Sequence, residues 1–272
     1  MPAARALVSV AAPVALVLAL GACGGSSDRG PQRSPRSAPR PVDVGTVRAL
    51  APGAYRDDLA HGARIERDPA TGAFAVASTA PARPRALVVT VHGHSGNAFA
   101  QYRLWRPYAA SRHLGLVAVE WQTRWGPGAR FLDARETYAM IRRAVRRAGV
   151  RPGRVLLHGF SKGSKEAFDL TSLDRAQGRL FALTVAESGA PRDATAPDPT
   201  LAGTSWVLYC GGRDQWPRIS GCPAMRRAKA FLLRSRARIG RFLVDPAARH
   251  GGFLLNRRDV ERTLADFATA RR

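Results

Sequence analysis

Six short runs of β-branched and aliphatic residues constrain the fold of this chain more than any other feature. Each run ends in turn residues, and longer segments with helical periodicity separate the runs. The runs are 86–91 (ALVVTV), 114–119 (LGLVAV), 154–158 (RVLLH), 180–186 (LFALTVA), 205–210 (SWVLYC) and 239–244 (IGRFLV). Continuous apolar runs of this length are typical of strands buried on both faces of a mostly parallel sheet. Their alternation with helical segments predicts βαβ units and an α/β fold.

Helix and hairpin signals occur between these runs. Apolar residues within 132–148 fall on or near one helical stripe, which Gly149 closes. Pro223 has the position of a first-turn proline, and Asn256 has that of an N-cap for a C-terminal helix. Residues 63–78 precede the first run and predict an antiparallel hairpin.

The first 45 residues do not have the composition of a folded domain. Residues 1–22 contain one basic residue followed by a long apolar stretch, which is the pattern of a targeting segment. Residues 23–45 are rich in Pro, Ser and Arg and cannot bury a core, so we expect a disordered tether. Residues 46–272 then suit one large α/β domain.

The apolar stretch ends in Leu20-Gly21-Ala22-Cys23. This sequence resembles the lipobox of bacterial lipoproteins, which implies a lipoprotein signal peptide, lipidation of Cys23 and attachment to the membrane. An ordinary secretory signal is the alternative. Both place the domain outside the cytoplasm, where we expect Cys210 and Cys222 to form one disulfide, with two buried free thiols as the alternative.

The charge of the chain is strongly positive. Its 43 Lys and Arg residues against 20 Asp and Glu residues give a net charge of +23, and only three of the 43 are lysines. The arginines are spread along the whole domain, whereas a nucleic-acid reader more often clusters basic and aromatic residues on one element. We therefore expect no nucleic-acid partner, but attraction to anionic envelope polymers or lipid head groups that weakens with salt.

The third run leads directly into Gly159-Phe160-Ser161-Lys162-Gly163, followed by a helix-compatible segment. In a G-x-S-x-G motif between a strand and a helix, the serine sits at the apex of a strained turn that exposes its hydroxyl above the sheet. The motif in this context resembles the α/β-hydrolase superfamily, and the match spans about two thirds of the chain, from the first run onward. The resemblance implies a nucleophilic Ser161, followed in the chain by an acid and then a histidine.

The partners of Ser161 are narrowed by chain order. Of the six histidines only His250 lies downstream of the serine, so it is the expected base unless the base is not a histidine. Asp214 directly follows the fifth run and is the favoured acid, while Glu187 after the fourth run is the alternative. The acid would orient His250 and stabilise its charged form.

The first run ends in His92-Gly93-His94-Ser95-Gly96, which resembles the H-G-x oxyanion loop of the superfamily. By this resemblance the backbone N–H groups of His94 and Lys162 form the oxyanion hole. His158 is expected to be a packed strand residue beneath the serine.

The surroundings of the serine carry weaker signals. Only 187–204 lies where many hydrolases insert a cap, so we expect no substantial cap domain. Three tryptophans are candidates for an aromatic wall, or else for packing under loops, and three arginines are candidates for contact with an anionic substrate. They are Trp121, Trp125, Trp216, Arg124, Arg192 and Arg213.

No metal-ligand or dinucleotide motif is present, so no cofactor is implied. The prediction is an extracytoplasmic, lipid-anchored serine hydrolase without a cap, most simply a carboxylesterase that resembles the polyhydroxyalkanoate-depolymerase and feruloyl-esterase-like group. Peptidases and acyltransferases share the same residues and remain alternatives. An inactive, basic envelope-binding module is an alternative of another class.

Overall fold

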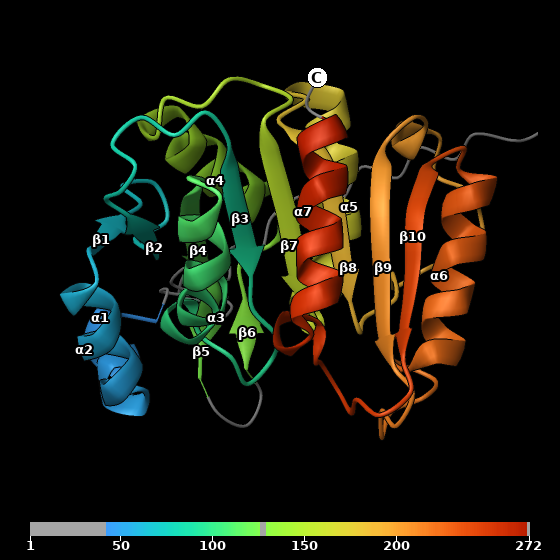
Figure 1. The fold of residues 1–272 in the computed structure, drawn as a ribbon, viewed down its shortest axis with the longest axis horizontal. Helices are drawn as coiled ribbons and strands as arrows, with labels where there is room; N and C mark the ends of the chain where they lie inside the picture. Colours follow the sequence, from blue (N-terminus) through green and yellow to red (C-terminus); the bar gives the residue numbers. More distant parts are fainter. Residues whose placement is uncertain (1–41, 126–128, 271–272) are drawn as a thin grey trace, which may run out of the picture. The chain divides into compact units, whose positions relative to one another are not determined.

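An eight-stranded sheet organises residues 42–125 and 129–270, the part of the chain that the computed structural model describes (Figure 1). The order across the sheet is β1-β2-β4-β3-β7-β8-β9-β10. Its strands are β1 (Ala63–Arg67), β2 (Phe74–Ser78), β3 (Leu87–Val91), β4 (Gly115–Glu120), β7 (Val155–Phe160), β8 (Phe181–Glu187), β9 (Ser205–Gly211) and β10 (Arg238–Asp245). A separate two-stranded sheet pairs β5 (Gln122–Arg124) with β6 (Arg130–Phe131). The expected signal peptide, and the expected tether up to residue 41, lie outside the described residues.

The six apolar runs correspond to the six strands from β3 to β10 in the large sheet, and these pair in parallel throughout. The expected hairpin is β1–β2, an antiparallel pair that joins the sheet through β2 and β4. The predicted α/β class with a mostly parallel sheet is therefore confirmed. Because the strands are parallel, the loops after β3, β7, β8, β9 and β10 meet at one edge of the sheet.

Helices cover both faces of the sheet (Figure 1). One face carries α1 (Val44–Leu50), α2 (Pro52–Ala60), α3 (Ala98–Ser111) and α7 (Arg257–Ala270). The other carries α4 (Ala134–Arg147), α5 (Lys162–Gln177) and α6 (Cys222–Arg234). None of the helices in the described part of the chain combines the length and apolar character that crossing a membrane requires.

The predicted helix boundaries agree with α4, α6 and α7. Pro223 stands in the first turn of α6, and the Asn256 side chain accepts a hydrogen bond from the backbone N–H of Asp259. Helices α1 and α2 were not predicted, and α3 was expected only as a helical segment between the first two runs, without bounds. Pro107 lies inside α3, where it interrupts the sequence signal of a continuous helix.

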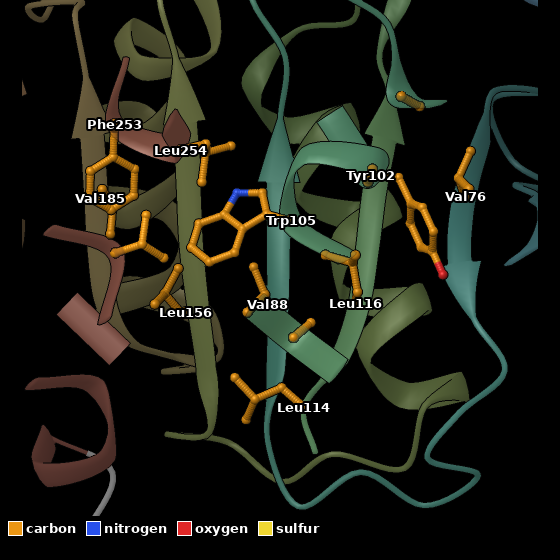
Figure 2. Packing of buried hydrophobic residues seen from close by; sticks show 14 of the residues in the cluster. Val76, Val88, Tyr102, Trp105, Leu114, Leu116, Leu156, Val185, Phe253 and Leu254 are labelled. Carbon is orange, nitrogen blue, oxygen red and sulfur yellow. The ribbon is translucent and has the colours of Figure 1, made fainter. Parts of the chain in front are cut away.

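Trp105 of α3 is the largest side chain in the core that lies between the sheet and the helices α3 and α7. It shares this core with Val88, Leu156 and Leu254 (Figure 2). Its indole N–H donates to Nδ1 of the buried His158 at 3.0 Å. Gln101 of α3 reaches the same nitrogen at 3.4 Å, so apolar packing and two polar contacts tie α3 to the strand that leads to Ser161.

Cys210 and Cys222 form a disulfide, as expected. Cys210 lies in β9 and Cys222 is the first residue of α6, so the bond closes the loop that carries Asp214. The sequence separation is 12 residues. This crosslink restricts a loop with two consecutive glycines, Gly211 and Gly212.

Replacing both cysteines, Cys210→Ala with Cys222→Ala, is expected to lower the free energy of unfolding by about 3 kcal/mol, because the open loop has more conformational freedom in the unfolded chain. Urea unfolding measures this change. The reduced wild-type protein is the control, since it loses the crosslink but keeps both side chains. An unchanged unfolding midpoint in both samples would contradict a stabilising role.

Candidate active site

Ser161 stands at the turn between β7 and α5 in a backbone conformation that side-chain-bearing residues rarely adopt. Its φ is 55° and its ψ is −110°. Such a residue carries a strain of about 1–3 kcal/mol, which persists only where its surroundings hold it. The backbone N–H of Ser161 donates to the carbonyl of Glu187 at 2.8 Å, and the carbonyl of Ser161 accepts from the N–H of Lys165 at 3.1 Å. The turn is therefore fixed from both sides.

The glycines of the motif permit a backbone approach that no other residue allows. A Cβ on Gly159 would lie 2.3 Å from the carbonyl oxygen of Gly163, and a Cβ on Gly163 would lie 2.2 Å from the carbonyl oxygen of Val91. A Cβ on Gly189, which the sequence analysis did not single out, would lie 2.2 Å from the carbonyl oxygen of Ser161. The first turn of α5 consequently packs directly on the end of β3.

Ser161, His250 and Asp214 form a continuous hydrogen-bonded chain, as their order in the sequence predicted. The Ser161 hydroxyl lies 2.8 Å from His250 Nε2, and His250 Nδ1 lies 2.8 Å from Asp214 Oδ2. The ionised carboxylate can only accept a hydrogen bond, so Nδ1 carries the hydrogen and Nε2 is free to accept the serine proton. The Asp214 side chain is fully buried, that of His250 is 17% exposed, and Ser161 is half-buried, so the base and the serine reach solvent and the acid does not.

The loops that carry the acid and the base pack against each other at backbone distance. A Cβ on Gly211 would lie 2.0 Å from the carbonyl oxygen of Arg249, next to His250. The N–H of Arg213 donates to the carbonyl of Ala248 at 2.9 Å. The second carboxylate oxygen of Asp214 accepts from the backbone N–H of Trp216 at 2.9 Å. The acid is thereby oriented independently of the histidine.

Glu187, the alternative acid, does not contact His250. Its Oε2 accepts from Nε2 of His158, and its Oε1 accepts from the backbone N–H of Phe253, both at 2.9 Å. His158 is confirmed as a packed strand residue, because Trp105 occupies its Nδ1 and Glu187 its Nε2. Glu187 holds the segment that follows the base, a role that sequence reasoning missed because its partners lie 29 and 66 residues away.

A second buried histidine–glutamate pair lies under the loop that contains His94. His92 Nε2 lies 2.9 Å from Glu120 Oε1, and His92 Nδ1 donates to the carbonyl of Gly93 at 2.8 Å. Glu120 also accepts from the backbone N–H of Ala98. Burial opposes charge on the ring, but the Glu120 carboxylate and the Gly93 carbonyl outweigh it and raise the pKa of His92. The pair fixes Gly93, where a Cβ would lie 3.0 Å from the Cβ of Ser161.

Of the three candidate tryptophans only Trp216 lies exposed beside the catalytic chain. It is 46% exposed and meets the His250 ring edge-on, with the ring centroids 4.8 Å apart. Trp121 is fully buried and packs against Phe131. The Lys162 ammonium lies over the rings of Trp121 and Phe131, and burial followed by repulsion from Arg192 lowers its pKa. The aromatic wall is thus reduced to Trp216 on the side of the base.

The segment between β8 and β9 contains only the short 3-10 helix η1 (Pro199–Leu201). No cap domain stands there, as expected. Across 42–125 and 129–270 no group of three or more His, Cys, Asp and Glu side chains is arranged to hold a metal ion.

Comparison with known proteins identifies the fold. No protein-family model matches the sequence, and no curated protein matches it. Solved structures do match. A carboxylesterase from Mesorhizobium loti has a TM-score of 0.59 at 18% identity and covers 76% of this chain and 99% of its own. A Bacillus cereus carboxylesterase has 0.56 at 16% identity, covering 74% and 96%. A fungal esterase from Rhizomucor miehei has 0.62 at 12% identity, covering 85% and 91%.

The part of the chain that the structure describes therefore has the α/β-hydrolase fold, with no cap domain between β8 and β9. This fold and the Ser–His–Asp arrangement at its carboxyl edge together define a serine hydrolase. At these identities the structural matches establish the fold, and the chemistry is argued from the site.

Asp214→Asn is expected to lower kcat by roughly 1,000- to 10,000-fold, because an amide presents the wrong partner to His250 Nδ1–H. Glu187→Gln keeps one of its two hydrogen bonds, so it should lower the free energy of unfolding by about 1–3 kcal/mol and leave kcat within about tenfold. Steady-state kinetics and urea unfolding of both variants check this. If the losses of kcat are reversed, Asp214 is not the acid.

Proposed function

We propose that this protein hydrolyses carboxylic esters through an acyl intermediate on Ser161. The observation that carries the proposal is the unbroken chain from the Ser161 hydroxyl through His250 to the buried Asp214, with 2.8 Å at both steps. A serine hydroxyl is a weak nucleophile until an adjacent base removes its proton. The solved structures named above as esterases support an ester rather than an amide substrate.

In the first half of the reaction His250 Nε2 takes the Ser161 proton while the serine oxygen attacks the ester carbonyl carbon. The charged oxygen of the tetrahedral intermediate is stabilised by the backbone N–H groups of His94 and Lys162. Lys162 is the first residue of α5, so the positive end of that helix faces the same oxygen. His250 then gives its proton to the leaving alcohol as the carbon–oxygen bond breaks.

In the second half a water molecule replaces the alcohol. His250 removes a proton from the water as its oxygen attacks the acyl carbon, and the carbon–oxygen bond to Ser161 breaks. The proton returns to Ser161, and the carboxylic acid is released. Throughout, Asp214 holds His250 in one tautomer and stabilises its charged form.

We place the protein nearest the small secreted esterases of the polyhydroxyalkanoate-depolymerase and feruloyl-esterase-like group. The open segment between β8 and β9 supports this, because a site without a cap admits bulky or polymeric esters. The disulfide supports a location outside the cytoplasm. The Leu20–Cys23 sequence supports lipid attachment, with 23–45 as a spacer from the membrane. The net charge of +23 supports contact with anionic envelope polymers.

Ser161→Ala and His250→Ala are each expected to lower kcat for a short activated ester by roughly a thousandfold or more, with the double variant scarcely worse. The reason is that the nucleophile and its base act as one unit. Ester kinetics measures the loss of turnover, and covalent labelling with a fluorophosphonate measures the reactivity of the Ser161 hydroxyl. His61→Ala is the matched control, because His61 is an exposed histidine at the end of α2. Full activity in His250→Ala would refute the assignment.

Cys23 is expected to carry lipid in the mature protein, and more than one acyl chain is needed for stable attachment. Mass spectrometry of the N-terminal peptide tests this, with Cys23→Ser as the control that should not be modified. An unmodified N-terminus, or mature protein free in the medium, would contradict lipid anchoring.

A further inference from the structure

A cavity of about 520 Å³ is lined by residues of α5, of α6 and of the loops after β8 and β9, and its lining is strongly basic. Five cationic side chains line it against a single carboxylate. They are Lys165, Arg192, Arg218, Arg227 and Arg234, against Asp193. The five come from four parts of the chain: α5, the loop after β8, the loop after β9, and α6.

The walls of this cavity belong to the segments that hold the catalytic chain in place. The N–H of Lys165 donates to the carbonyl of Ser161, one helical turn away. Ala190 lines the cavity and follows Gly189, which packs on the same carbonyl. Ile219 lines it from the acid loop, where its N–H donates to the carbonyl of Trp216 at 3.0 Å. The cavity therefore adjoins the segments that hold Ser161 and Asp214, although neither residue lines it.

The positive charge of the cavity is largely uncompensated. Among the described residues, only Arg192 of the five cations has a carboxylate partner, Glu166 at 3.2 Å. Asp193 is occupied within its own turn, where Oδ1 accepts from the N–H and the hydroxyl of Thr195. Burial followed by repulsion from Arg192 lowers the pKa of Lys165. Repulsion of this kind is relieved when an anion enters.

Two of the arginines also brace the walls. The Arg227 guanidinium donates to the carbonyl of Arg218 in the acid loop, and the Arg234 guanidinium donates to the carbonyl of Ala194 in the loop after β8, both at 2.6 Å. Arg227 and Arg234 are two turns apart on one face of α6. Because their partners are neutral carbonyls, both keep a full positive charge at the cavity.

We propose that this cavity is a subsite for an anionic group, a carboxylate or a phosphate, carried by the ester substrate. The inference rests on the proposed function and names its substrate class: esters with a negative charge in the acyl or the alcohol part. A neutral ester would offer the cations of this cavity no opposite charge. Of the three arginines that the sequence offered for an anionic substrate, Arg192 lines the cavity, and Arg124 and Arg213 are not among its lining residues.

The test compares kcat/KM for two matched pairs of esters. The first pair is mono-4-nitrophenyl glutarate and 4-nitrophenyl pentanoate, which differ in acyl charge. The second is the butyrate ester of 3-hydroxybenzoate and that of 3-hydroxybenzamide, which differ in alcohol charge. Wild-type protein is expected to prefer the anionic member of at least one pair by about tenfold.

The variant Lys165→Gln with Arg218→Gln removes two charges whose side chains have no polar partner in the described structure. It should lower the preference about tenfold and leave kcat/KM for the neutral ester within about twofold. The control is Arg226→Gln with Arg258→Gln, two exposed arginines outside the cavity. This control lowers the net charge of the protein by the same two units but leaves the cavity unchanged. Its preference for the anionic ester should therefore change less than twofold.

Absence of a preference in both pairs, or an equal loss in the two double variants, would overturn the subsite. If Ser161 is required for hydrolysis of neutral esters but the anionic esters are not preferred, this inference is refuted and the proposed function stands. If no ester is hydrolysed and Ser161 does not react with a fluorophosphonate, the proposed function fails, and the subsite fails with it.

Discussion

The contact of α5 with the end of β3 is the constraint on which the site depends. Gly163 meets the carbonyl of Val91 so closely that no side chain fits between them. This approach brings the first turn of α5 against the loop that begins at His92, directly after Ser161 with its positive φ. The positions of the nucleophile and of both proposed oxyanion donors therefore depend on this backbone contact.

Two buried polar pairs hold the loops that surround Ser161. His92 with Glu120 holds the loop after β3, and His158 with Glu187 holds the segment after the base. Both pairs lie where water cannot replace a lost partner, so each loop has one favoured position. The acid loop is fixed differently, through its disulfide and its packing on the base loop. Each strand end of the site thus has its own support.

The sequence was sufficient to predict the sheet and the order of the catalytic residues, because both are local or follow from chain direction. Buried parallel strands are continuous apolar runs, and only one histidine follows Ser161. The bounds of helix α3 escaped prediction because Pro107 interrupts its pattern. The role of Glu187 and the basic cavity escaped because each joins segments distant in sequence. The hydrophobic pattern of the sequence does not indicate that Lys165 and Arg218 line the same cavity.

The span of the catalytic chain also determines when the site comes into existence. Ser161 and His250 are 89 residues apart, and the segments between them include β8, β9 and β10. Parallel strands cannot pair through a tight turn, so this half of the sheet depends on non-local contacts that form late and cooperatively. A chain that has formed only β1 to β7 holds the serine but has neither acid nor base. Recovery of catalytic activity during refolding therefore requires the completed sheet. An activity assay would measure how fast this half of the sheet forms.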